Sequence, residues 1–235
     1  RALAAEAERG GFRVARGQAY QAEASVPYAL FTDTFLPLLK EETAESLNVL
    51  TRGGLPELVC LLPGLDPGGE RVAPLDSESP DEFRARVLWT FAELLRGLAE
   101  KKPLLLVMEE LHWADSSSLE IIHYLARQLQ GYPAFLLLTR EDMAPGEAPG
   151  AKKVEHSLLS QDVAESVVLP PLSREETGVL MSEAFGVGAE TAGPFVDKLH
   201  EWTEGNPYFL QETLKSLVDS GRLYQKGGAW LGWEI

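Results

Sequence analysis

The stretch PLLLVMEELHWADSSSLEII, residues 103–122, carries the strongest indication of the fold class. Its continuous apolar run from Leu104 to Met108 is typical of a strand buried on both faces of a parallel sheet. Two acids, Glu109 and Glu110, follow this run, and a polar cluster then opens a helix. Because open α/β sheets bind their ligands at the carboxyl ends of the strands, the two acids stand where a site is expected.

The residues after the acids complete a strand, helix and strand unit. Ser117 and Glu120 are spaced as a capping box, and the apolar stripe of the predicted helix ends before Gly131. A second apolar strand, AFLLLT at residues 134–139, comes next. Short connections of this kind build right-handed βαβ units, so the sequence predicts a parallel sheet flanked by helices.

The upstream part of the chain predicts further elements of the same layer. RALAAEAERGG, residues 1–11, predicts a helix that ends on two glycines, and residues 12–20 predict a short strand. Residues 27–65 predict several short helices separated by Pro and Gly, whereas residues 66–80 are a loop by composition.

A long helix is then expected to cover the sheet. Ser79 is its predicted N-cap, Pro80 its first residue and Glu82 the partner in a capping box. Its apolar residues share one face, as expected of a helix that packs on a sheet, and they are Phe83, Val87, Phe91, Leu94 and Leu98.

The pattern changes after a short apolar piece, SVVL at residues 166–169, which stops at two prolines. From Ser173 onward the pattern is helical, and Ser173 with Glu176 forms another predicted capping box. Residues 221–233 predict a hairpin around their two adjacent glycines. The sequence therefore predicts an α/β layer up to about residue 172, a helical subdomain and the start of a β-containing part.

Composition excludes several classes of protein. The 21 basic and 36 acidic residues leave a net charge of −15, which disfavours broad attraction to nucleic acid phosphates or to anionic membranes. Cys60 is the single cysteine, so no internal disulfide can form and nothing requires an oxidising compartment. The longest apolar runs are far below the roughly 20 residues of a membrane helix. We expect a cytoplasmic protein without a membrane span.

The paired acids suit metal and water chemistry. An acid at the end of a buried strand can hold a divalent metal, usually through water, and its neighbour can orient or deprotonate an attacking water. The alternative is that Glu109 and Glu110 are solvated loop residues, favoured near a helix N-terminus by the helix dipole.

The segment LLLVMEELHWAD, residues 104–115, resembles the Walker B segment of the STAND-type signal-transduction ATPases, which are AAA-like P-loop proteins. The family normally carries Asp where this chain has Glu109. The resemblance implies that ATP and Mg²⁺ are the cofactors. It also implies that Glu109 holds the metal and that Glu110 positions or activates water.

Three other segments resemble the same family. LLLTRE resembles the sensor segment, which implies that Thr139 and Arg140 lie near the terminal phosphate, although an Arg that leaves a strand is usually a surface charge. LPPLSREE, residues 169–176, resembles the join between the ATPase core and its helical lid. The resemblance also implies that a Gly-x-Pro motif opens a lid helix beside the adenine base, and its residues here are Gly205, Asn206 and Pro207. Alone, such a tripeptide is a turn.

Three residues after the acids carry no primary catalytic role in this interpretation. His112 is more typical of a packed or hydrogen-bonded histidine, and without a second ligand at the right spacing it does not predict a zinc site. Trp113 is expected in the core or the wall of the site, and Asp115 is expected to cap the next helix.

The chain contains no phosphate-binding loop of the form GxxxxGK[ST], because neither Gly10-Gly11 nor Gly68-Gly69 is followed by the required Lys and helix. Residues 1–20 instead resemble the helix that this loop opens and the strand after it. The resemblance implies that a strand and the loop lie upstream of Arg1, and that this strand would lie between the sensor strand and the last strand of the sheet. We therefore expect residues 1–235 alone to bind ATP poorly or not at all.

The resemblance implies three parts: a P-loop NTPase core (1–172), a helical lid (173–221) and the start of a winged-helix module (222–235). It also implies a switch that binds and slowly hydrolyses ATP in a multidomain signalling or transcription regulator. The expected partners are nucleotide, other domains of the same polypeptide and further copies on activation, without direct nucleic acid binding. The alternative is a catalytically silent interaction scaffold, and a free-standing DNA binder is the weakest reading given the negative charge.

Overall fold

The computed structural model describes residues 2–62, 64–65, 79–141 and 149–232. The chain divides into two compact units, Arg1–Ser166 and Val167–Ile235. The loop predicted at residues 66–80 falls mostly outside the described residues.

The first unit is built on a three-stranded parallel sheet in the order β1, β2, β3. The strands are β1 (Arg13–Gln18), β2 (Leu104–Glu109) and β3 (Ala134–Leu138). β2 lies in the middle and is bonded along both edges, and its apolar residues from Leu104 to Met108 are all buried. This confirms the predicted parallel α/β layer, which is the sheet of a P-loop NTPase-like fold.

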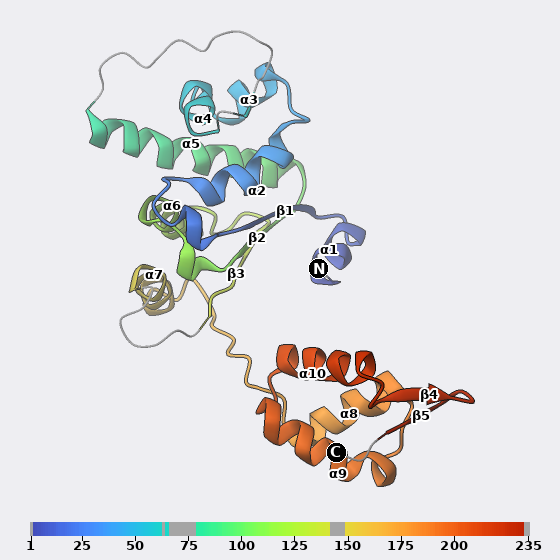
Figure 1. Cartoon of the computed structure of the whole chain (residues 1–235). Helices are drawn as coiled ribbons and strands as arrows, with labels where there is room; N and C mark the ends of the chain where they lie inside the picture. Colours follow the sequence, from blue (N-terminus) through green and yellow to red (C-terminus); the bar gives the residue numbers. More distant parts are fainter. Residues whose placement is uncertain (1, 63, 66–78, 142–148, 233–235) are drawn as a thin grey trace. The chain divides into compact units, whose positions relative to one another are not determined.

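Seven helices and two 3₁₀ turns are described around this sheet. They are α1 (Ala2–Arg9), η1 (Gln21–Glu23), α2 (Ala29–Leu39), α3 (Ala44–Leu50), α4 (Leu55–Leu61), α5 (Pro80–Lys101), η2 (Leu111–Trp113), α6 (Ser116–Gln128) and α7 (Pro149–Ser160). Figure 1 shows α2 beside β1, and α3 and α4 packed on the side of α5 that faces away from the sheet.

The core lies between α2, α5 and the sheet. Three rings, Phe31, Phe35 and Phe91, meet there with centroids 5.2 to 5.5 Å apart. All three rings are fully buried, and burial stabilises the fold by about 1.5–3 kcal/mol for each such side chain. The predicted capping box of Ser79 and Glu82 starts α5, and the predicted apolar face is the buried one apart from the partly buried Phe83.

The start of α6 confirms the predicted cap Asp115, whereas Ser117 lies inside the helix. One carboxylate oxygen of Asp115 accepts hydrogen bonds from the backbone N–H groups of Ser117 and Ser118, each over 3.0 Å. The same oxygen accepts the N–H of Tyr28 over 3.2 Å. The predicted capping box with Glu120 is therefore wrong: this carboxylate already satisfies the free donors of the first turn, and Glu120 binds Arg84 instead.

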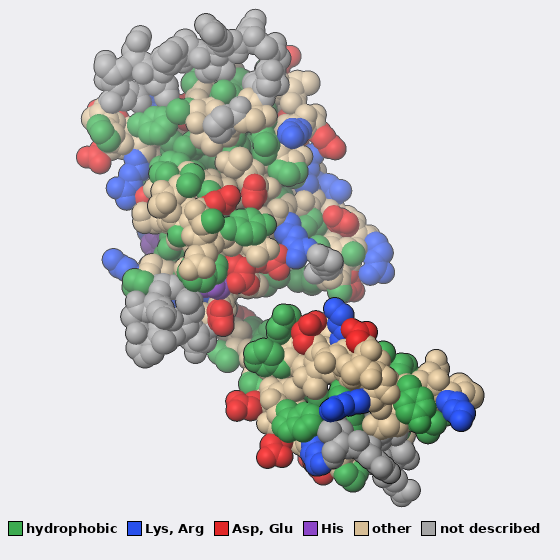
Figure 2. Space-filling view, viewed as in Figure 1, with side chains coloured by type: hydrophobic (Ala, Val, Ile, Leu, Met, Phe, Trp, Pro, Cys, Tyr) green, Lys and Arg blue, Asp and Glu red, His purple; other side chains and the backbone are tan. Residues whose placement is uncertain are grey.

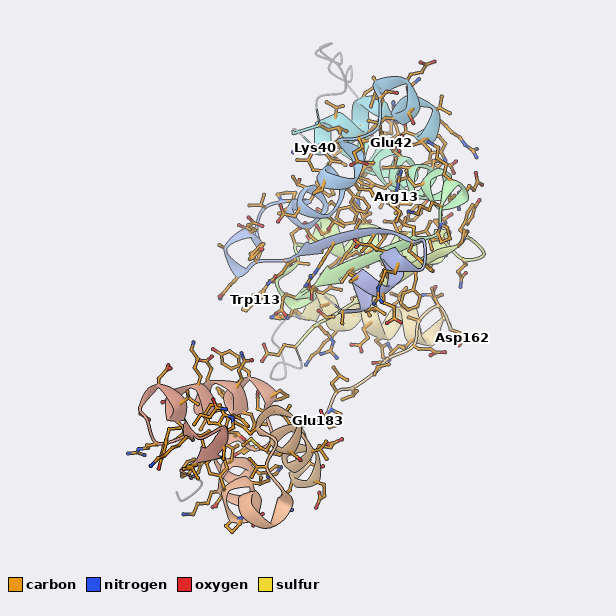
Figure 3. The ribbon with its side chains drawn as sticks, turned by 90° about the vertical axis from the view of Figure 1, so that its right-hand side faces the viewer. Arg13, Lys40, Glu42, Trp113, Asp162 and Glu183 are labelled. Atoms are coloured by element: carbon orange, nitrogen blue, oxygen red, sulfur yellow. The ribbon has the colours of Figure 1, made fainter. Side chains whose placement is uncertain are left out.

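A polar cluster ties the start of β1 to the helices. Figure 3 places Arg13 next to Glu42, and their side chains form an ion pair of 3.1 Å. The Ser46 hydroxyl donates to the Glu42 carboxylate over 2.6 Å and holds the pKa of that carboxyl below its ordinary value, with help from Arg13 and Lys101. Trp113 lies at the opposite end of the sheet, where the strands end.

The second unit contains α8 (Arg174–Phe185), α9 (Ala189–Thr203), α10 (Pro207–Asp219) and the antiparallel pair β4 (Tyr224–Lys226) and β5 (Ala229–Leu231). The predicted capping box of Ser173 and Glu176 is confirmed. Gly227 and Gly228 join the two strands with φ of 61° and 84°, as a two-residue type I′ turn requires. The unit has its own buried core, made of Met181, Phe195, Val196, Leu199, Leu210, Leu217 and Leu223.

The apolar piece at residues 166–169 forms no strand. Val167, Val168 and Leu169 are 79% to 87% exposed. The edge of β3 that faces away from β2 pairs with no strand in the described part of the chain, and Phe135 on β3 is 58% exposed. Apolar composition alone therefore does not produce a strand at residues 166–169, which pair with no strand among the described residues.

Candidate functional site

The two acids lie where β2 ends. Glu109 is the last residue of β2, and Glu110 turns the chain into η2 with φ 60° and ψ 40°. This left-handed conformation costs a residue with a side chain about 1–3 kcal/mol and is concentrated at functional sites. The turn ends the strand between the two acids.

Thr139 joins the end of β3 to the same turn. Its N–H donates to Met108 over 3.0 Å, and its carbonyl accepts the N–H of Leu111 over 2.9 Å. Its hydroxyl accepts the N–H of Glu110 over 3.3 Å. The structure therefore brings Glu109, Glu110 and Thr139 together at the carboxyl edge of neighbouring strands.

Arg16, on the neighbouring strand β1, engages the Glu109 carboxylate. Two of its nitrogens lie 2.6 and 2.7 Å from the same Glu109 oxygen. The side chains are 39% and 28% exposed, so the pair contributes about 0–1 kcal/mol to stability. No sequence pattern predicts a role for Arg16, since only the parallel pairing of β1 with β2 brings it to this edge.

The side chain of Arg140 contacts helix α7. Its Nε donates to the Glu155 carboxylate of α7 over 2.7 Å, and another guanidinium nitrogen donates to the carbonyl of Glu141. The backbone of Arg140 follows Thr139 directly, but its guanidinium is held against α7.

His112 is buried beside Glu110. Its Nδ1 accepts the N–H of Glu141 over 3.3 Å, and its Nε2 lies 3.4 Å from a carboxylate oxygen of Glu110. The prediction of a hydrogen-bonded histidine is confirmed. Its position two residues after Glu110 is the sequence feature that could have indicated its closeness to that acid.

Gly205, Asn206 and Pro207 lie in the second unit, at the start of α10. Asn206 is the N-cap, and its side-chain oxygen accepts the N–H of Tyr208 over 3.0 Å, while Pro207 is the first helical residue. Gly205 has φ 73°, and a Cβ there would overlap the carbonyl oxygen of Leu172. Each residue of the motif therefore has a structural role.

The carboxylates at the β2 edge fit one kind of metal site. Among the described residues, no group of three or more His, Cys, Asp or Glu could hold a metal ion by itself. Mg²⁺ usually keeps several waters and binds one or two carboxylates together with nucleotide phosphates. Glu109 supplies one hard oxygen donor of this kind at the end of β2, which fits a magnesium ion that arrives with a nucleotide.

The surface and the helices limit other roles. On the face shown in Figure 2, Lys and Arg side chains are mixed with Asp and Glu side chains and form no continuous basic patch. No helix in the part of the chain that the structure describes is long and apolar enough to cross a bilayer.

Comparison with known proteins gives one match. No curated protein and no solved structure matches the chain. The model of the AAA ATPase domain family matches residues 1–138, which include β1, β2, both acids and β3. Because this match covers more than half of the chain, the protein belongs to the AAA ATPase domain family.

Proposed function

We propose that this chain is the ATP-binding and ATP-hydrolysing switch core of a STAND-type multidomain regulator. The proposal rests on one observation: three predicted site residues lie together at the carboxyl edge of β2 and β3, namely Glu109, Glu110 and Thr139. This edge is where α/β sheets bind ligands, and ATP-dependent switches change conformation when the terminal phosphate is lost.

Each site residue has a role in the proposal. Glu109 holds a hydrated magnesium ion and Glu110 positions or activates the attacking water. Thr139 and Arg140 sense the terminal phosphate, which requires the Arg140 guanidinium to leave Glu155. A bound magnesium ion would supply charge neutralisation for the phosphates.

The lid motif has a separate role. Gly205, Asn206 and Pro207 open α10 beside the adenine base, so that the lid helix responds to the nucleotide.

The phosphate-binding loop is assigned to a segment upstream of Arg1. The sequence contains no GxxxxGK[ST] run, and the outer edge of β3 pairs with no strand among the described residues. A parallel strand on this edge would cover Phe135 and deliver the loop to the carboxyl end of the sheet.

Self-association on activation, a cytoplasmic location and a role in transcription control belong to the same proposal, and the net charge of −15 disfavours direct nucleic acid binding.

One observation favours a second function, a catalytically silent interaction scaffold. Arg16 already neutralises Glu109, the proposed metal ligand. In a scaffold this ion pair would be permanent, whereas in an ATPase the metal has to compete with Arg16 for the carboxylate.

The magnesium dependence of ATP hydrolysis separates the two functions. In the polypeptide extended upstream to include the loop, we expect slow hydrolysis that requires Mg²⁺. Arg16→Met removes the competing cation and should lower the half-saturating Mg²⁺ concentration by up to about fivefold, the factor for an exposed ion pair worth roughly 1 kcal/mol.

Arg84→Met is the matched control, because it removes another exposed Arg and Glu pair of the same unit, with Glu120 on α6. This variant should keep the Mg²⁺ requirement of the parent. An extended polypeptide that neither binds nor hydrolyses ATP favours the scaffold. Hydrolysis with a higher Mg²⁺ requirement in Arg16→Met, or with none in the parent, contradicts the role of Glu109.

A further inference from the structure

His112 connects the end of β3 with Glu110. Its side chain is 1% exposed, and its ring packs against Trp113 with the centroids 4.8 Å apart. A ring packed in this way cannot turn freely, so the directions of its two nitrogens are set by the fold.

The backbone of Glu141 decides which ring nitrogen carries the proton. Its N–H donates to Nδ1 of His112 over 3.3 Å. A ring nitrogen that accepts a hydrogen bond is unprotonated, so the neutral ring carries its proton on Nε2. Glu141 belongs to the segment that leaves β3, and this segment therefore fixes the tautomer.

Glu110 supplies the carboxylate oxygen nearer to the protonated nitrogen. Nε2 lies 3.4 Å from Oε2 of Glu110 and 3.9 Å from Oε2 of Glu141, whose side chain is 73% exposed. The shorter distance is longer than an optimal hydrogen bond, but catalytic hydrogen bonds are often long before substrate binds and tighten in its complex.

We infer that His112 is a positioning residue for Glu110. Its Nε2–H holds the Glu110 carboxylate in the orientation that meets the attacking water, and the Glu141 N–H keeps the ring in the required tautomer. The inference rests on the proposed function, since this orientation affects hydrolysis only if Glu110 acts on water.

The connection also gives the sensor segment a path to Glu110. Thr139 binds the backbone of Glu110 and Leu111, and two residues later Glu141 binds the His112 ring. A shift of this segment on contact with the terminal phosphate would therefore move the Glu110 backbone and the imidazole together.

The first test uses residues 1–235 and needs no ATPase activity. Nitrogen NMR of the imidazoles, with His112 assigned by its loss in His112→Gln, should show a proton on Nε2 and none on Nδ1. Glu110→Gln should shift the His112 Nε2 signal more than Glu141→Gln does, and should leave His123, His156 and His200 unchanged. A proton on Nδ1, or a larger shift in Glu141→Gln, overturns the inference.

The second test uses two variants in the extended polypeptide. His112→Gln keeps an N–H donor near the position of Nε2, whereas His112→Asn keeps an acceptor near Nδ1 but lacks that donor. We expect His112→Asn to lower kcat by about 10- to 100-fold with KM nearly unchanged, and His112→Gln to restore most of the loss.

The outcomes of the second test separate the two claims. If Glu110→Gln leaves hydrolysis unchanged, the proposed function fails, and the NMR result still decides what His112 contacts. If Glu110→Gln abolishes hydrolysis but both His112 variants keep the parent kcat, the inference fails alone. If both variants lose kcat and thermal stability to the same extent, His112 has a packing role, and this outcome also overturns the inference.

Discussion

Glu110→Gln is expected to lower ATP hydrolysis by the extended polypeptide about 100- to 10,000-fold while ATP binding is kept. This is the usual contribution of a positioned general base, and the amide keeps the size of the carboxylate but has little basicity. Glu110 lies at the left-handed turn after β2, with its N–H on the Thr139 hydroxyl. These backbone contacts remain in the variant, so the fold should not change.

The measurement is single-turnover hydrolysis together with a nucleotide-binding titration. Glu120→Gln is the matched control, because it removes a carboxylate from α6 in the same unit at a residue that pairs with Arg84. Turnover in this control should stay near that of the parent. If Glu110→Gln keeps more than about a tenth of the parent rate, Glu110 is not the residue that activates water.

Gly205→Ala is expected to destabilise the second unit by on the order of 3 kcal/mol. Two effects add at this position. The φ of 73° already disfavours any residue with a Cβ, and that Cβ would overlap the carbonyl of Leu172. The Leu172 backbone cannot easily move away, because its N–H donates to Gly205 over 2.9 Å and its carbonyl lies 3.1 Å from Nε2 of His200.

Gly186→Ala separates these two effects. Gly186 ends α8 in the same unit with φ 66°, and a Cβ there would meet no atom within 4 Å. This variant should cost only about 1 kcal/mol, the conformational part of the effect. Hydrogen exchange of the amides in α8, α9 and α10 measures both changes. Equal protection in the two variants would contradict the structural role of Gly205.

The parallel α/β layer could be predicted because the sequence patterns that indicate its strands and helices are local. A continuous apolar run after a capped amphipathic helix predicts a buried parallel strand, and β2 and α5 confirm it. For the start of α6 the sequence indicated two caps, and the structure confirms Asp115 and not the capping box of Ser117 with Glu120. Asp115 also accepts the N–H of Tyr28, a contact with a distant segment that no spacing in the sequence indicates.

The candidate site was predictable only in part. The carboxyl ends of neighbouring parallel strands meet, so the closeness of Thr139 to Glu110 follows from the order of the strands. The partners of the other side chains depend on register and direction. Arg16 reaches Glu109 across the sheet and Glu155 holds Arg140 from α7, and no spacing in the sequence indicates either pair.

The motif at residues 205–207 was also predictable only in its local part. The sequence indicated a turn at Gly205, Asn206 and Pro207, and the structure confirms the turn and the helix start. The close approach of Gly205 to Leu172 joins residues far apart in the sequence, and only the folded unit reveals it.

A calorimetric titration of magnesium-ATP tests the central claim most directly. The claim is that residues 1–235 carry the metal and water half of an ATP site, and that the phosphate loop comes from the chain upstream. We expect no micromolar binding by residues 1–235 and micromolar binding by the polypeptide extended to include the strand and the loop. Micromolar binding by residues 1–235 alone, or none by the extended polypeptide, would contradict it.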